Sequence, residues 1–427
     1  MAFLLAMVCG LGVVFAETQP GICVVDLKTY PGKDPTMWGG LYAASTGKVY
    51  SALITEGGSS HIYEYDPAAG ANRMICDVAD FLGERGKGIR PSSKIHCTPV
   101  EDDAGNIYFV TLNNGSGPRS MDFTSWRGGH WLKYDPKTEK MEDLGLVSQG
   151  EGAYPLALDK KRMHLFGIGF KGYLYRFDIN SRTTINLGRV AAHDICRSMF
   201  CDDLGRVYGS FPTARIWRYD PQKEAAYDLS ITMPYDPTVY PGRLNNPAID
   251  RTHEWRYIQW DPVEKVAYGV TGGSGSILFK YDPHDGPEGK ITPMGRLCDS
   301  QYLDRRDVPY STMTLVLDSK TRKIYFAPSN RPYSIDTYME TFGSDLPHQL
   351  VMYDLKTDKR KDLGVMKTAD GIRVFGCEGA SIAPDGTVYL CGQAEVKDPK
   401  KATRHTRTDN IPIALHLVIY KPQMAKN

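Results

Sequence analysis

The sequence lacks an excess of charge of either sign, and it lacks the motifs of common nucleotide and serine-hydrolase sites. Lys and Arg together number 51, whereas Asp and Glu number 50. A chain without a strong positive field gives no basis for binding nucleic acid or an anionic membrane. No G-x-G-x-x-G, P-loop or G-x-S-x-G pattern occurs. Dinucleotide, nucleoside triphosphate and serine-nucleophile chemistry therefore have no support in the sequence.

Long apolar runs are absent apart from residues 1–16. This segment is uncharged, and Val14-Phe-Ala16 fits a small-residue cleavage site. We therefore predict a signal peptide over 1–16, cleaved after Ala16, and a secreted or periplasmic protein without membrane insertion. Residues 17–427 keep eight cysteines and contain no C-x-x-C pair. An even number permits disulfides in an exported chain, and buried free thiols are the alternative.

A repeated hairpin pattern runs through the chain. Trp131-Leu-Lys-Tyr-Asp-Pro-Lys-Thr-Glu-Lys-Met-Glu-Asp-Leu-Gly145 recurs as a near copy over 351–364, with weaker copies elsewhere. The anchor positions are Asp66, Asp135, Asp178, Asp220, Asp282, Asp354 and Lys421. The closest anchors are 43 residues (135 to 178) and 42 residues (178 to 220) apart, which is the length of a four-stranded propeller blade. The pattern predicts an all-β, seven-bladed β-propeller over 17–427 as a single domain.

The last blade has sequence for only three of its four strands. Nothing follows Pro422 that would form the outermost strand, whereas the segment Gly21-Ile-Cys-Val-Val-Asp-Leu27 has strand character and no other partner. We predict that this N-terminal strand completes the last blade beside 417–420 and closes the ring.

Long connections are expected on one face of the ring. The first-to-second and third-to-fourth strand turns are short, whereas the other connections include 113–129, 235–254, 298–310, 329–348 and 393–411. Long loops on a rigid scaffold commonly carry the functional site.

Aligning the seven blades on their first turn identifies the residues that start each innermost strand. These are Trp38, His96, Tyr154, Arg197 (with His193 just before it), Arg256, Met313 and Glu378. Nearby loops add Arg90, Lys94, Trp126, Arg127, His130, Lys171 and Arg243. Ordinary structural roles and charge pairing are the alternative for each residue, but so many ionisable groups at one level of several blades indicate a site. His96, His130 and His193 would also allow a divalent metal, and no cofactor is specified by any motif.

The segments Gly88-Ile-Arg-Pro-Ser-Ser-Lys-Ile-His-Cys97 and Ser125-Trp-Arg-Gly-Gly-His-Trp131, with the Tyr-Asp-Pro repeats, resemble seven-bladed polysaccharide lyases. Ulvan, oligogalacturonate and rhamnose–glucuronate lyases share that architecture. The resemblance implies β-elimination beside a uronate carboxylate in a polysaccharide or oligosaccharide. It implies proton transfer by His96, His130 or Tyr154 and a carboxylate clamp by Arg197 or Arg256, with the other funnel residues binding substrate.

Two other functions remain open at this stage. A non-catalytic propeller could bind a glycan or a protein on the same face through aromatic rings such as Trp126, Trp131, Trp255 and Tyr257. A glycoside hydrolase would need paired carboxylates, and the alignment places only Glu378 in the funnel, with Asp194 as a second candidate.

Overall fold

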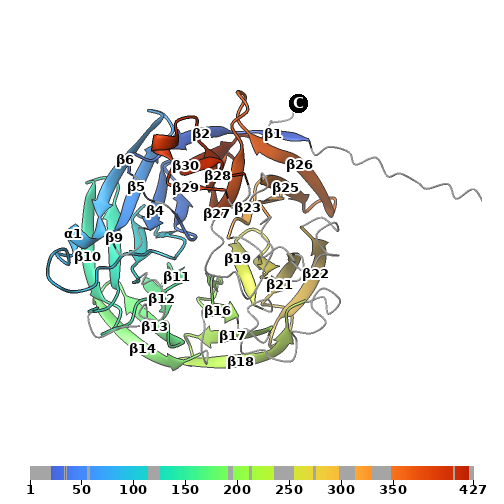
Figure 1. The fold of residues 1–427 in the computed structure, drawn as a ribbon. Coiled ribbons are helices and arrows are strands. Elements are labelled where there is room, and N and C mark those ends of the chain that lie inside the picture. Colours follow the sequence, from blue (N-terminus) through green and yellow to red (C-terminus); the bar gives the residue numbers. More distant parts are fainter. Residues whose placement is uncertain are drawn as a thin grey trace, which may run out of the picture.

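The protein is an all-β ring in a computed structural model. The structure describes residues 21–32, 34, 36–54, 58–113, 126–190, 196–210, 214–234, 254–272, 276–297, 313–328, 348–406 and 409–422. Its strands form seven sheets around a central axis (Figure 1). Five sheets contain four antiparallel strands, and the other two contain four such strands and one additional strand each, so the predicted seven-bladed propeller is confirmed.

The first four blades use strands that are consecutive in sequence. Blade 1 contains β3 (Leu41–Ala43), β4 (Val49–Ile54), β5 (Ser60–Asp66) and β6 (Ala71–Asp77). Blade 2 contains β7 (Val100–Glu101), β8 (Ile107–Val110), β9 (His130–Asp135) and β10 (Lys140–Leu146). Blade 3 contains β11 (Leu156–Asp159), β12 (His164–Ile168), β13 (Tyr173–Asp178) and β14 (Thr183–Arg189). Blade 4 contains β15 (Phe200–Cys201), β16 (Val207–Ser210), β17 (Arg215–Asp220) and β18 (Ala225–Thr232).

The remaining three blades complete the ring. Blade 5 contains β19 (Trp255–Asp261), β20 (Val266–Thr271), β21 (Ile277–Asp282) and β22 (Lys290–Arg296). Blade 6 contains β23 (Val316–Asp318), β24 (Lys323–Phe326), β25 (Gln349–Asp354) and β26 (Lys359–Lys367). Blade 7 contains β27 (Val374–Ile382), β28 (Val388–Glu395), β30 (Pro412–Tyr420) and β2 (Asp26–Thr29), and the short β29 (Arg404–His405) pairs with β30. The helix α1 (Val78–Phe81) follows β6, and no helix in the described ranges is long and apolar enough to cross a membrane.

The repeated aspartate is the residue that turns each outer hairpin. In blade 2, Asp135 Oδ1 accepts the backbone N–H of Lys137 at 2.9 Å. The aspartates at 66, 178, 220, 282 and 354 accept from the residue two positions later at the same distance. This side-chain hydrogen bond mimics a backbone turn, which is why the position favours Asp over other residues. The Tyr-Asp-Pro repeat is therefore a turn signal.

The N-terminal segment closes the ring, but only part of it pairs with the strand that was predicted. Only β2 supplies the outermost strand of blade 7, with Asp26 opposite Ile419. The preceding β1 (Ile22–Val24) instead runs parallel to β26 of blade 6, with Ile22 opposite Val365. The chain crosses between the two blades at Val25, which is 2% exposed and donates its N–H to Lys367 O at 2.9 Å. Figure 1 shows β1 and β2 one after the other along the outer rim of the ring, β1 beside β26 and β2 beside β30.

Several smaller expectations are also resolved. The segment 393–411 is not one long loop, because β28 extends to Glu395 and β29 pairs with β30. Cys23, Cys76, Cys97, Cys196, Cys201, Cys377 and Cys391 are free thiols, and no disulfide occurs within the described ranges. Cys298 and the predicted signal peptide lie outside those ranges.

Candidate functional site

The seven residues that begin the innermost strands do meet near the axis. We call Trp38, Lys94, His96, Tyr154, Arg197, Arg256 and Glu378 the central cluster. Met313, the seventh strand-start residue, packs against Gly39 from blade 6, where an added Cβ would lie 2.5 Å from Met313 Cε. Gly39 N in turn donates to Glu378 O at 3.0 Å, which joins blades 1 and 7.

His96 is the most enclosed member of the central cluster. Its side chain is 0% exposed, and its Nε2 lies 3.2 Å from Arg197 Nη1. Its ring stacks on Trp38 with centroids 5.8 Å apart and meets Tyr154 edge-on at 5.1 Å. Burial, followed by the positive charges of Lys94, Arg197 and Arg256, holds the pKa of His96 well below its ordinary value. His96 is therefore a neutral imidazole at physiological pH.

The protonated nitrogen of His96 follows from its partner. A guanidinium can only donate hydrogen bonds, so Nε2 must accept from Arg197, and the single ring proton sits on Nδ1. Within the described part of the chain, Nδ1 has no hydrogen-bond partner. His96 is thus oriented to donate a proton or a hydrogen bond from Nδ1.

Cationic side chains surround the rings of the central cluster. Lys94 Nζ lies 5.4 Å from the Trp38 ring centroid and 5.8 Å from that of Tyr154. Arg197 Cζ lies 5.7 Å from the Tyr154 centroid. These distances allow cation–π attraction between the rings and the charged forms of the two side chains. Tyr154 is 6% exposed and is held between two cations.

The central cluster carries more positive than negative groups. Arg256 is 2% exposed, and its Nη2 lies 3.8 Å from Glu378 Oε2. Glu378 is the only carboxylate among the seven side chains, against the three basic residues Lys94, Arg197 and Arg256. Among these seven side chains, basic groups therefore outnumber carboxylates, and desolvated like charges repel one another.

A cavity of about 390 Å³ is lined by residues from all seven blades. Arg197 belongs both to this lining and to the central cluster. Thr98 and Tyr257 also line the cavity, and Thr98 Oγ1 lies 2.9 Å from Tyr257 Oη. Thr98 Oγ1 also donates to Gly39 O at 3.2 Å, so the Tyr257 hydroxyl is the donor between the two side chains. Tyr257, predicted to bind substrate, lines this cavity and links blade 5 to the segment before β7 through Thr98.

The structure places other predicted residues outside the central cluster. His130 is the first residue of β9 rather than part of a loop, and its Nδ1 lies 2.8 Å from Asp143 Oδ1 on the outermost strand of blade 2. Trp126 is 3% exposed and packs with Leu112 and Tyr154, so it contacts the central cluster through Tyr154. Lys171 is exposed in the turn between β12 and β13.

The remaining residues that were predicted to form the site make no described contact with the central cluster. Arg127 is exposed and Arg90 is partly buried. Trp131 and Trp255 are 0% exposed and hydrogen-bonded through their indole nitrogens to Thr184 Oγ1 and Ser198 O. These two rings belong to the core, so the expectation that they stack on sugars was wrong. His193, Asp194 and Arg243 lie outside the described residues.

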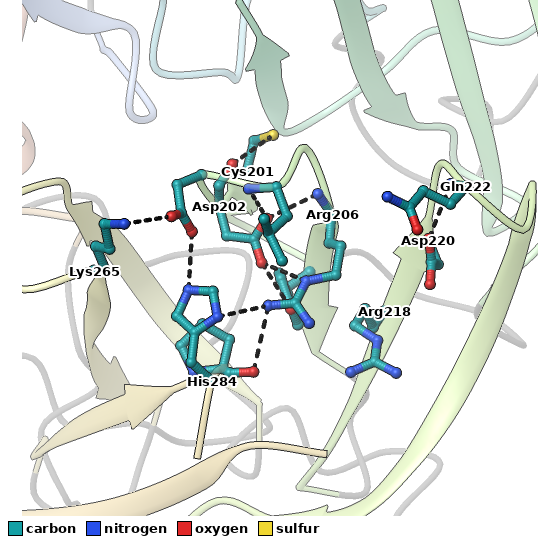
Figure 2. A network of polar contacts seen from close by, with 12 residues as sticks. Cys201, Asp202, Arg206, Arg218, Asp220, Gln222, Lys265 and His284 are labelled. Carbon is teal, nitrogen blue, oxygen red and sulfur yellow. Dashed lines mark hydrogen bonds and ion pairs between the residues drawn. The ribbon is translucent and has the colours of Figure 1, made fainter. Parts of the chain in front are cut away.

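The group best spaced for a metal lies elsewhere. Within the described ranges, Asp202, Asp203 and His284 form the one set of three candidate ligands whose atoms lie within 4.8 Å of one another. Figure 2 shows that basic side chains already occupy it. Asp202 Oδ2 lies 2.6 Å from Arg206 Nε, and Asp203 Oδ2 lies 3.0 Å from Lys265 Nζ. His284, in the Tyr-Asp-Pro-His turn of blade 5, lies 2.9 Å from Asp203 of blade 4, so the network links two blades.

Sequence reasoning missed two polar residues. Thr98 is partly buried and lies two positions after His96 in the segment before β7, and this alternate spacing was the available signal. Glu254 is 0% exposed two positions before Arg256, and its charge contributes to the raised pKa of the Cys196 thiol after burial itself. No sequence feature distinguishes Glu254 from an exposed glutamate.

Comparisons with known proteins support the fold alone. No protein-family pattern matches the chain, and no curated protein sequence matches it. A chain in the crystal structure of a mitotic checkpoint complex is similar with a TM-score of 0.53 and 11% identity, over 98% of each chain. A streptogramin B lyase is similar with a TM-score of 0.56 and 10% identity, over 92% of this chain and 96% of that one.

Proposed function

We propose that the protein is a secreted or periplasmic lyase that cleaves uronate-containing glycans by β-elimination at the central cluster. The observation that carries the proposal is the contiguous, buried group of His96, Tyr154 and Arg197 with additional cations beside it. Such a reaction needs a cation for the carboxylate as it becomes enolate-like, a base for the adjacent proton and an acid for the leaving oxygen.

The geometry suggests how these tasks are divided. Arg197 and Arg256 hold the carboxylate, because guanidinium groups match carboxylate oxygens in two-point contacts. Tyr154 lies within 5.8 Å of both Lys94 Nζ and Arg197 Cζ, measured from its ring centroid, and is assigned the abstraction of the proton next to the carboxylate that these cations hold. His96 presents its Nδ1 proton and serves as hydrogen-bond donor or acid to the departing oxygen.

A second function, binding of a glycan without cleavage, is favoured by the burial of the central cluster. His96 has no solvent-exposed surface and Arg256 is only 2% exposed, so a substrate would have little direct access to these two side chains. A chain that binds the carboxylate of a glycan without cleaving it would use the cations for affinity and His96 to position Arg197. A hydrolase has less support, because Glu378 is the only carboxylate in the central cluster and inverting or retaining hydrolysis uses two.

The deciding experiment screens uronate-containing polymers, such as polygalacturonate, ulvan and heparan sulfate, with the purified mature protein. Cleavage by elimination creates an unsaturated uronate whose ultraviolet absorbance grows with time. Growth of that absorbance supports the lyase, whereas saturable binding without any absorbance change supports the binding protein. New reducing ends without the absorbance would show hydrolysis.

The proposed compartment has its own test. Mass spectrometry of the protein recovered outside the cytoplasm is expected to give a mature chain that begins at Glu17. Recovery of the chain with Met1 retained would contradict export by the predicted signal peptide.

A further inference from the structure

Lys94 is the most accessible basic side chain of the central cluster. Lys94, Trp38 and Glu378 are partly buried, whereas His96, Tyr154, Arg197 and Arg256 are buried. Glu378 is committed to Arg256 at 3.8 Å. Of the three basic side chains of the central cluster, Lys94 is therefore the one most exposed to an approaching anion.

The surroundings of Lys94 are unusual for a lysine. Its Nζ contacts two aromatic rings, and no ion pair joins it to a carboxylate of the described residues. The charged or titratable groups that face it are His96 on its own segment, Tyr154 of blade 3, Arg197 of blade 4 and Arg256 of blade 5. Burial, together with the charges of Arg197 and Arg256, lowers the pKa of Lys94 to about 7.

A bound carboxylate would reverse these conditions. Its negative charge beside Nζ offsets the repulsion from the two arginines and favours the ammonium form. Because only the protonated amine attracts the anion strongly, binding and protonation of Lys94 are linked.

We propose that Lys94 couples carboxylate binding to proton uptake. In part of the unliganded population Lys94 is the neutral amine, and the entering carboxylate causes its nitrogen to accept one proton from water or buffer. This inference rests on the carboxylate-binding part of the proposed function and adds a pH response to it.

The test is isothermal titration of the mature protein with glucuronate and galacturonate, in phosphate and in Tris, between pH 6 and pH 8. The two buffers have different ionisation enthalpies, so the difference in observed heat gives the number of protons taken up. We expect uptake of about half a proton at pH 7, rising toward one at pH 8. Affinity should fall about tenfold from pH 6 to pH 8, because the protonated fraction falls by that factor. Methyl glucoside, which has no carboxylate, should show neither effect.

Two substitutions isolate Lys94. Lys94→Arg keeps the charge at every pH in the range, so proton uptake should vanish and affinity should become independent of pH. Lys94→Met removes the charge, so affinity for the uronates should be weak throughout the range from pH 6 to pH 8. Lys359→Met, at an exposed lysine on β26, is the matched control and should behave like the unaltered protein.

The inference is overturned if Lys94→Arg still takes up a proton, which would assign the coupling to His96 or another group. It is also overturned if neither uronate binds, or if binding by the unaltered protein does not change with pH. Proton-coupled binding in a protein that cleaves no uronate polymer would support the inference and refute the lyase.

Discussion

His96 illustrates how one neighbour fixes the chemistry of a side chain. Arg197 occupies its Nε2, and the surrounding positive charge keeps the ring neutral. The imidazole is therefore available as a donor at neutral pH without first losing or gaining a proton. Tyr154 packs edge-on against the same ring, so the two side chains to which we assign proton transfer contact each other directly.

Removing either group should reduce catalysis far more than stability. We expect His96→Ala and Tyr154→Phe each to lower turnover by at least about hundredfold, the usual loss for a general acid or base. The measurement is the initial rate of unsaturated uronate formation on a confirmed substrate, with circular dichroism to verify folding. His405→Ala, at an exposed histidine on β29, is the matched control. Full activity in both cluster variants would place the chemistry elsewhere.

His61 is a second histidine whose ring is fixed by its neighbours, in this case two carboxylates away from the central cluster. Its Nδ1 lies 2.7 Å from Asp34 Oδ1 and its Nε2 lies 3.3 Å from Asp77 Oδ2. The hydrogen bond to Asp34, then the charges of both carboxylates, raise the pKa of His61 above its ordinary value despite burial. The protonated ring therefore joins the segment before blade 1 to the end of β6.

The raised pKa of His61 means that this residue stabilises the fold more at low pH than at high pH. The contribution of His61 is complete below the unfolded-state pKa of about 6.5 and is lost as pH rises through the higher folded-state value. His61→Gln should lower the free energy of unfolding by about 1 kcal/mol at pH 5.5 and by less at pH 9. Urea denaturation midpoints at the two pH values test this, and a loss that is equal or larger at pH 9 would contradict it.

At the scale of the strand, the Leu-Gly that closes several hairpins marks a bulge. Gly145 and Gly364 have φ of 115° and 104°, and each lies where the outermost strand shifts register against its partner. Residues with a Cβ rarely adopt this conformation. The two positions differ in their surroundings, because an added Cβ meets nothing within 4 Å at Gly145 but lies 2.0 Å from Gly21 O at Gly364.

This difference gives a matched pair of substitutions. Gly145→Ala should reduce the free energy of unfolding by about 1 kcal/mol through backbone strain alone. Gly364→Ala should cost more, because it also pushes the chain entering β1 away from blade 6. Chemical denaturation measures both values, and hydrogen exchange at Ile22–Val24 should increase only in the second variant. Equal effects would mean that the contact with Gly21 is unimportant.

At the scale of the whole molecule, the N-terminal segment ties two blades together. β1 pairs with blade 6 and β2 with blade 7, while Cys23 and Val25 are buried in the core between them. Without this segment, β26 and β30 would present unpaired edges.

Deletion of residues 1–27 should therefore open the ring and abolish cooperative thermal unfolding. Deletion of residues 1–20, which leaves both strands in place, is the control and should unfold like the mature protein. Calorimetry compares the two, and a cooperative transition of unchanged midpoint in the longer deletion would contradict a closing role.

The repeat made the fold predictable, because each hairpin carries its own turn aspartate and can be recognised locally. Alignment of the blades then placed Trp38, His96, Tyr154, Arg197, Arg256 and Glu378 together, since equivalent positions of a propeller converge on one axis. The parallel pairing of β1 could not be foreseen, because it joins distant segments without a turn. His130 was misplaced because a long connection in sequence gives no indication of where the next strand begins.

The pairing of β2 with β30 also orders events in time. A ribosome makes β2 before every blade, whereas β30 is the last described strand to be made. β2 must therefore wait, unpaired and partly apolar, until almost all of the chain has been made. The ring can close only after β30 appears. We therefore expect the interval between the synthesis of β2 and that of β30 to be the period in which the unfinished chain is most prone to aggregate.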